Sequence, residues 1–163
     1  MIKYAKKDNF YSIFPMGEIP NDWEELTKED YDKHFEKTFD ELKVEKLSEL
    51  TEITSKFDNQ LVNNEMVIKS SLGFSINADL RSQNNLRGLI AVGVEPVNFV
   101  TADNSVQSLS IEQLNILLNE TIKNGENLYK TKWELRNRIL NSSSVEELNS
   151  IKFKFVMLDF SAS

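Results

Sequence analysis

His34 is the only histidine of this 163-residue chain, and the chain contains no cysteine. A catalytic triad, a proton shuttle or a histidine-based metal centre would therefore depend on this one side chain. Asp30 lies one helical turn before His34 and could share a metal ion with it, but two ligands are too few for a specific site. The charged neighbours Asp32 and Lys37 favour a surface position. We predict no catalytic residue, no metal site and no cofactor.

Other patterns typical of enzymes are absent or have a structural explanation. The five glycines are scattered, so no glycine-rich phosphate loop is present. The neighbouring carboxylates Glu146 and Glu147 diverge on a helix, and Glu24 and Glu25 are a similar pair. A hydrolase whose carboxylates converge only in three dimensions stays open. A small enzyme of unknown type is therefore the least favoured function, behind protein binding.

The negative charge is concentrated in one segment. Between Glu18 and Glu52 the chain carries 13 acidic and 5 basic residues, whereas its formal net charge is −7. Nucleic-acid binding requires a basic surface, so this distribution disfavours it. The acidic segment is either a solvated helix face or a docking surface for a basic partner. No apolar run reaches the ~18 residues of a membrane span, and the first ten residues lack the apolar stretch of a signal peptide.

Thr27 is a good N-cap for a long amphipathic helix over residues 27–60. Its apolar stripe steps by three or four residues but slips by five near Val44, so either the helix bends there or two helices meet. A continuous helix of this length would measure about 50 Å, which exceeds a small domain. The pattern leaves open a homo-oligomer formed through this helix.

The second half of the sequence alternates hairpin and helix signals. The chain ends with an apolar tail, 152–160, that forms a strand or is held by a partner. The predicted elements before the tail are a hairpin of strands 66–70 and 74–77, a helix over 80–92, a hairpin of strands 97–101 and 106–109, a helix over 110–141 and a short helix after Ser144.

A polar motif separates the first of these hairpins from its helix. Asp79 is placed to cap the helix, while Arg81 and Gln83 would hydrogen-bond the adjacent hairpin. The alternative is a binding site formed by Asp79, Arg81, Ser82 and Gln83. Gly125 interrupts the apolar face of the longest helix, which indicates a bend or the close approach of another element.

These residues carry a resemblance to a known domain. The strand, the D-x-R-S-Q motif and the following helix, together with the closing ELRNRILNSSSVEELNSI, resemble an uncharacterised domain of bacteriophage tail proteins over residues 64–151. The resemblance implies a role in a phage tail and brings no catalytic motif with it.

The first 26 residues are rich in aromatic side chains between turns. Tyr11, Phe14 and Trp23 are interpreted as partly exposed anchors for a partner. The aromatic side chains that we assign to the core are Phe35, Phe39, Phe57 and Trp133. Residues 2–36 resemble the start of phage tail fibre assembly proteins, with a tyrosine-rich strand and the turn Ile19-Pro20-Asn21-Asp22-Trp23 before an acidic helix. From residue 40 onward the two patterns differ.

The sequence therefore predicts an α+β protein in which small β-hairpins pack on helices, preceded by a long acidic amphipathic helix. We divide it into an N-terminal part, 1–62, and a compact phage-tail domain, 63–163. The resemblances imply a tail fibre assembly chaperone whose partner is the phage tail fibre protein, in the cytoplasm of the bacterial host or on the virion tail. The alternative is a structural or receptor-binding component of the tail. No nucleic acid or membrane is expected as a partner.

Overall fold

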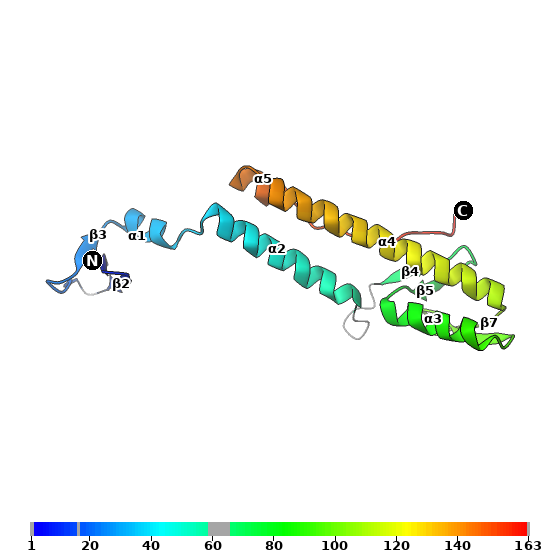
Figure 1. The fold of residues 1–163 in the computed structure, drawn as a ribbon. Helices are drawn as coiled ribbons and strands as arrows, with labels where there is room; N and C mark the ends of the chain where they lie inside the picture. Colours follow the sequence, from blue (N-terminus) through cyan, green and yellow to red (C-terminus); the bar gives the residue numbers. More distant parts are fainter. Residues whose placement is uncertain (1, 16, 59–65, 163) are drawn as a thin grey trace. The chain divides into compact units, whose positions relative to one another are not determined.

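The computed structural model describes residues 2–15, 17–58 and 66–162. The chain divides into two compact units, Met1–Leu42 and Lys43–Ser163, each considered by itself below. The predicted boundary at residues 62 and 63 lies outside the described residues. The predicted α+β class is confirmed: small antiparallel sheets and hairpins accompany the helices (Figure 1).

The first unit is a small sheet with one helix. Strands β1 (Lys3–Lys7), β2 (Phe10–Phe14) and β3 (Glu24–Leu26) form an antiparallel sheet in the order β2-β1-β3. The sequence predicts one or two short strands around Lys3–Tyr4 and Tyr11–Phe14, where β1 and β2 lie; it does not predict β3, which lies in an acidic stretch with little strand propensity. Helix α1 (Lys28–Phe35) follows, and the Thr27 side chain accepts a hydrogen bond from the Asp30 N–H, as the cap prediction requires.

Of the two alternatives left open for residues 27–60, a bent helix or two helices that meet, the structure has two helices, but their junction is not where it was predicted. Helix α1 ends at Phe35, α2 runs from Phe39 to Ser55, and the short 3-10 turn η1 (Lys56–Asp58) follows. The Thr38 hydroxyl accepts from the Glu41 N–H at 3.2 Å, and the Glu41 carboxylate accepts from the Thr38 N–H at 2.7 Å. This reciprocal capping box starts a new helix, so the break falls before Thr38 and not near Val44.

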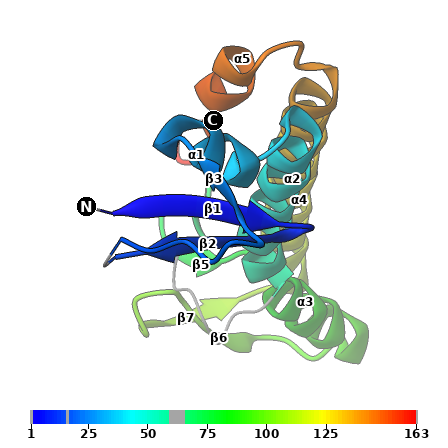
Figure 2. The same ribbon diagram turned by 90° about the vertical axis from the view of Figure 1, so that its left-hand side faces the viewer.

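The second unit follows the predicted element order closely. Its elements are the hairpin of β4 (Val67–Lys69) and β5 (Ser75–Asn77), helix α3 (Leu80–Val92), the hairpin of β6 (Val97–Val100) and β7 (Val106–Leu109), helix α4 (Ile111–Asn141) and helix α5 (Val145–Ser150). Helix α3 packs beside the first half of α4, and α2 runs alongside its second half (Figure 1). Helix α5 turns back from the end of α4 (Figures 1 and 2).

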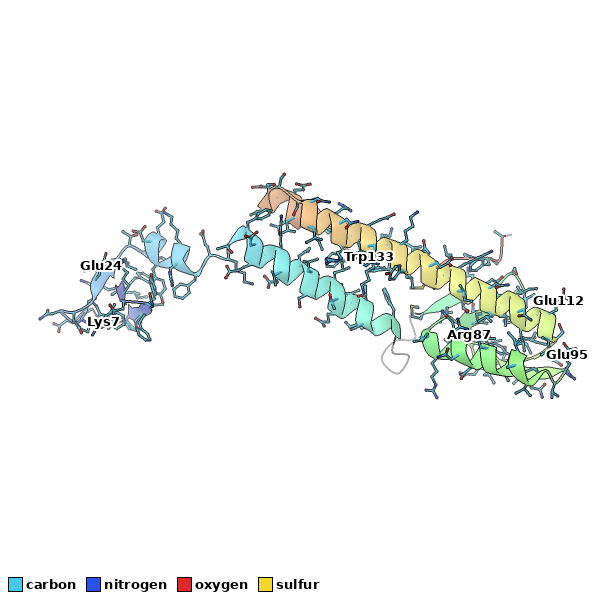
Figure 3. The ribbon with its side chains drawn as sticks, viewed as in Figure 1. Lys7, Glu24, Arg87, Glu95, Glu112 and Trp133 are labelled. Carbon is cyan, nitrogen blue, oxygen red and sulfur yellow. The ribbon has the colours of Figure 1, made fainter. Side chains whose placement is uncertain are left out.

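Local signals explain these boundaries. Ser110 and Gln113 form the predicted capping box of α4, and the Glu95 carboxylate also accepts from the Ile111 N–H at this helix end (Figure 3). Helix α3 ends at Gly93, whose φ of 69° is left-handed and suits a glycine C-cap. Asn104, with a φ of 63°, makes the tight turn between β6 and β7.

The core of the second unit lies where α3 and the first half of α4 meet the hairpins. Its fully buried members are Ile68, Ile76, Ala78, Leu86, Leu109, Leu114 and Leu117. Along the second half of α4, Leu128, Leu135 and Ile139 are also buried, as is Leu50 of α2. One face of α4 is therefore buried along most of its length.

The C-terminal tail is held by the unit itself. The Phe160 N–H donates to the Lys69 carbonyl at 2.8 Å, a single parallel bridge pairs Lys69 with Asp159, and their charged groups lie 3.4 Å apart. Met157 and Phe160 pack against the core. The sequence leaves open whether the tail forms a strand or is held by a partner. Among the described residues the tail forms no extended strand, and β4 of the same unit holds it.

We expect residues 43–163 to fold alone with a single cooperative melting transition, because most of α2, the core and the tail contacts lie within this fragment. A shorter fragment, 64–151, loses Met157, Phe160 and α2 and should melt at a clearly lower temperature. Differential scanning calorimetry of the two fragments and the full chain measures this. Equal melting temperatures for both fragments would show that the tail and α2 add no stability.

Candidate functional site

Three polar side chains are buried on the core side of α4. Glu120 is 6 % exposed, and Thr121 and Asn124 are 0 % exposed. One carboxylate oxygen of Glu120, Oε1, accepts from the backbone N–H of Ser71 at 3.0 Å and from its hydroxyl at 2.6 Å. The other oxygen, Oε2, has no hydrogen-bond partner among the described residues. Glu120 thus holds the turn between β4 and β5 against the helix.

Asn124 holds the tail in the same way. Its Oδ1 accepts from the Leu158 N–H at 2.9 Å, and its Nδ2 lies 3.5 Å from the Met157 sulfur. One turn later, the Asn127 side chain donates to the Val156 carbonyl at 3.0 Å. Burying an amide without partners is costly, so these bonds fix where the tail crosses α4. The polar row is a structural clamp, which sequence reasoning missed because glutamate and asparagine usually mark a solvated helix face.

Asn124→Ala should release the tail and destabilise the protein by roughly 1–3 kcal/mol, the cost of leaving the half-buried Leu158 N–H without its protein partner. Hydrogen exchange at the Leu158 amide should accelerate strongly. Asn115→Ala is the matched control, because Asn115 is exposed on the same helix and bonds only the local Ile111 carbonyl at 2.8 Å. Unchanged exchange at Leu158 in Asn124→Ala would show that the side chain does not hold the tail.

A pocket of about 350 Å³ opens where α2, α3 and α4 meet. This volume is at the lower end of the range for ligand sites in proteins. Most of its lining is apolar, and Lys132 is the charged residue among the described lining residues. The lining consists of Thr54, Phe57, Met66, Ala78, Leu80, Gln83, Gly125, Leu128, Tyr129 and Lys132. The arrangement can hold an apolar group and one anionic group.

The pocket brings together two residues of the sequence prediction, Gln83 and Gly125. The Gln83 amide donates to the Thr121 carbonyl of α4 at 3.3 Å, and not to the hairpin as predicted. A Cβ built on Gly125 would meet only the Gln83 Nε2 within 4 Å, at 3.5 Å, an ordinary van der Waals distance. The prediction of a close backbone or ring at Gly125 is therefore wrong: α4 continues through the glycine, and the space above it belongs to the pocket.

The other residues of the polar motif lie apart from the pocket lining. Asp79 is the N-cap of α3, as predicted: its carboxylate accepts from the Ser82 N–H at 3.0 Å and from the Ser82 hydroxyl at 2.9 Å. Arg81 is exposed and makes no hydrogen bond or ion pair with another described residue, so its predicted bond to the hairpin is absent. The four residues therefore do not form one site.

The predicted anchors of the first unit lie on opposite faces of its sheet. Because side chains alternate along a strand, Phe10 and Phe14 share one face of β2 while Tyr11 is on the other. Tyr11 is half-buried against α1, stacked on His34 with ring centroids 3.4 Å apart. Phe14 meets Trp23 edge-on at 5.6 Å. We therefore call Phe10, Phe14 and Trp23 the open sheet face, because α1 covers the other side.

Two aromatic residues assigned to the core are exposed. Phe35 is 57 % exposed at the end of α1, and Trp133 is 43 % exposed on α4 (Figure 3). Phe39 and Phe57 are half-buried. Helical spacing places a side chain on a face, but whether that face is covered depends on what packs across it.

Charged groups of the described part of the chain support local structure. No group of three or more histidine, aspartate or glutamate residues is placed to hold a metal ion among the described residues. The pKa of Glu147 is lowered mainly by the Ser143 N–H, and the pKa of Asp103 mainly by the Thr101 hydroxyl. These carboxylates stabilise a helix start and a turn. In the described ranges, no helix combines the length and apolar character needed to cross a membrane.

The comparison with protein families assigns most of the second unit. Residues 42–153 match the family described as Domain of unknown function (DUF4376). The chain belongs to this family. No curated protein and no solved structure matches the chain. The DUF4376 region begins at the boundary between the two units and includes most of α2, all of α3 and α4, and every described residue that lines the pocket.

Gly125→Ala should raise the melting temperature, because alanine favours a helix by about 1 kcal/mol over glycine and the new methyl meets no atom closer than 3.5 Å. Gly88→Ala is the matched control: Gly88 lies inside α3 with open space around it and should give a similar increase. Thermal denaturation of both variants measures the effect. A lower melting temperature for Gly125→Ala alone would show that α4 does not accept a methyl group there.

Proposed function

We propose that the protein is a non-catalytic assembly chaperone for a bacteriophage tail fibre, and that its first unit binds the fibre. The resemblance of residues 2–36 to tail fibre assembly proteins supports this role. The resemblance of residues 64–151 to a domain of phage tail proteins supports the same setting. The place of action would be the cytoplasm of the bacterial host during assembly.

The observation that carries the proposal is the open sheet face of the first unit. Phe10 is 70 % exposed at one end of β2, and Phe14, which contacts Trp23, is at the other end of the strand; both Phe14 and Trp23 are half-buried. Exposed aromatic side chains that cluster on one face are typical of protein-binding surfaces. Such a face can cover an apolar fibre end before the fibre assembles.

Charged pairs surround this apolar face. The Lys3 ammonium lies 3.1 Å from the Glu25 carboxylate, and Lys7 pairs with Asp22 (Lys7 is labelled in Figure 3). The four side chains are 32–60 % exposed, so these two ion pairs add little stability. A polar rim around an aromatic centre is the usual anatomy of an interface, and the acidic excess favours a basic partner.

A structural or receptor-binding tail component is the second candidate. It is favoured by the size of the DUF4376 region, which spans more of the chain than the first unit and resembles a domain of tail proteins. Detection of the protein in purified virions would favour this role, whereas a fibre that matures and releases the protein would favour the chaperone.

Co-expression with the cognate fibre should make the fibre soluble and trimeric. Phe10→Ala should weaken fibre binding at least about tenfold, or 1.4 kcal/mol, because it removes an exposed anchor. Trp23→Ala should have a similar effect. Binding is measured by calorimetry with purified fibre, and the melting temperature of Phe10→Ala should stay unchanged because its ring is mostly solvated.

Phe35→Ala is the control on the α1 side of the same unit, where the phenylalanine is 57 % exposed, and it should leave fibre affinity unchanged. A fibre that is equally soluble and trimeric without the protein would refute the chaperone role. Equal losses of affinity from Phe10→Ala and Phe35→Ala would refute the assignment of binding to the open sheet face.

A further inference from the structure

The pocket at the junction of α2, α3 and α4 is unused by the function proposed above. Its lining lies in the second unit, whereas the open sheet face lies in the first. Binding of a ligand in this pocket is therefore independent of whether the first unit binds a fibre.

Gly125 is the first argument that the pocket is a binding site. Glycine is unfavourable inside a helix, and here neither a bend nor a close neighbour requires it. Its effect on the structure is to leave out a side chain at the pocket wall, where any larger residue would occupy the space.

Lys132 supplies the second argument. It is half-buried, lies on the pocket face of α4 one turn after Leu128 and Tyr129, and forms no ion pair with a described carboxylate. An ammonium beside apolar side chains is complementary to a carboxylate. The ligand should therefore combine an apolar group with a negative charge.

The surface beyond the pocket indicates the kind of ligand. Tyr129, 61 % exposed, contacts Trp133 edge-on at 5.9 Å, and the Arg136 guanidinium lies 5.6 Å from the Trp133 ring centre. Trp133 is seen on α4 in Figure 3. Trp133 thus extends the aromatic surface one turn past Tyr129, the last aromatic residue of the pocket lining, which favours a ligand that reaches beyond the pocket.

We propose that the pocket is the anchor site for a segment of a partner polypeptide, which inserts an apolar side chain over Gly125 and places a neighbouring carboxylate on Lys132. Tyr129 and Trp133 contact the next residues of that segment. The amide of Gln83, held by the Thr121 carbonyl, borders this position and lies 3.5 Å from where a Gly125 Cβ would be.

The test uses the full chain and two probes that differ by one charge, N-acetyl-Leu-Phe and its C-terminal amide. Titration followed by ¹H–¹⁵N NMR should give saturable shifts confined to the pocket residues, and the acid should bind at least about threefold more tightly than the amide. Lys132→Gln should remove this preference. Lys130→Gln should keep it, because Lys130 is exposed and its nearest carboxylate is Glu134, 3.9 Å away.

Gly125→Leu should abolish binding of both probes by filling the pocket, whereas Gly88→Leu should not. If Gly125→Leu does not fold, the Lys132→Gln variant still tests the proposal, because this half-buried side chain can be changed without filling the pocket. Equal binding of acid and amide, or no binding of either, would overturn the proposal. Decanoate that binds in the pocket more tightly than the dipeptide would assign the site to a fatty acid and overturn the polypeptide partner.

Discussion

The fully buried side chain of Asn124 on α4 is the constraint on which the second unit depends, because a buried amide is tolerated only when its hydrogen bonds are made. It accepts from the Leu158 N–H, and Glu120, one turn earlier, accepts from Ser71. A turn and a tail that are distant in sequence are thereby placed on the same helix. The apolar core could tolerate small shifts of either segment, but the directional bonds do not.

The position of α3 follows from a second set of polar contacts. Asp79 starts the helix at a defined residue, and Gln83 then bonds the α4 backbone at Thr121. With α2 also packed along α4, three helices meet near Gly125, where one of them has no side chain. The pocket is a consequence of this packing and of one missing side chain. Lys132, the one cation among the described lining residues, gives this largely apolar hollow a preferred charge for its ligand.

The first unit is stabilised differently. Ala5 is its one fully buried apolar residue among those described, and ring contacts such as Tyr4 with Tyr31, at 5.0 Å, replace an aliphatic core. So small a sheet cannot cover both of its faces with one helix. The face that carries Phe10 is therefore only partly covered: Ala5, opposite Ser12 on that face, is buried, whereas Phe10 is 70 % exposed, and binding through Phe10 requires no conformational change.

Local chemistry in the sequence determined the hairpins, α3, α4 and their caps, because each depends on residues at most a few positions apart, as with Ser110 and Gln113. The Thr38–Glu41 capping box is equally local and could have been predicted from the sequence. The apolar stripe continues across it, however, and favoured a longer helix over a new helix start at Thr38. Exposure of Trp133, burial of Asn124 and the pocket beside Gly125 were decided by tertiary structure alone. Each depends on which element packs across the helix, and helical periodicity assigns a residue to a face without saying what covers it.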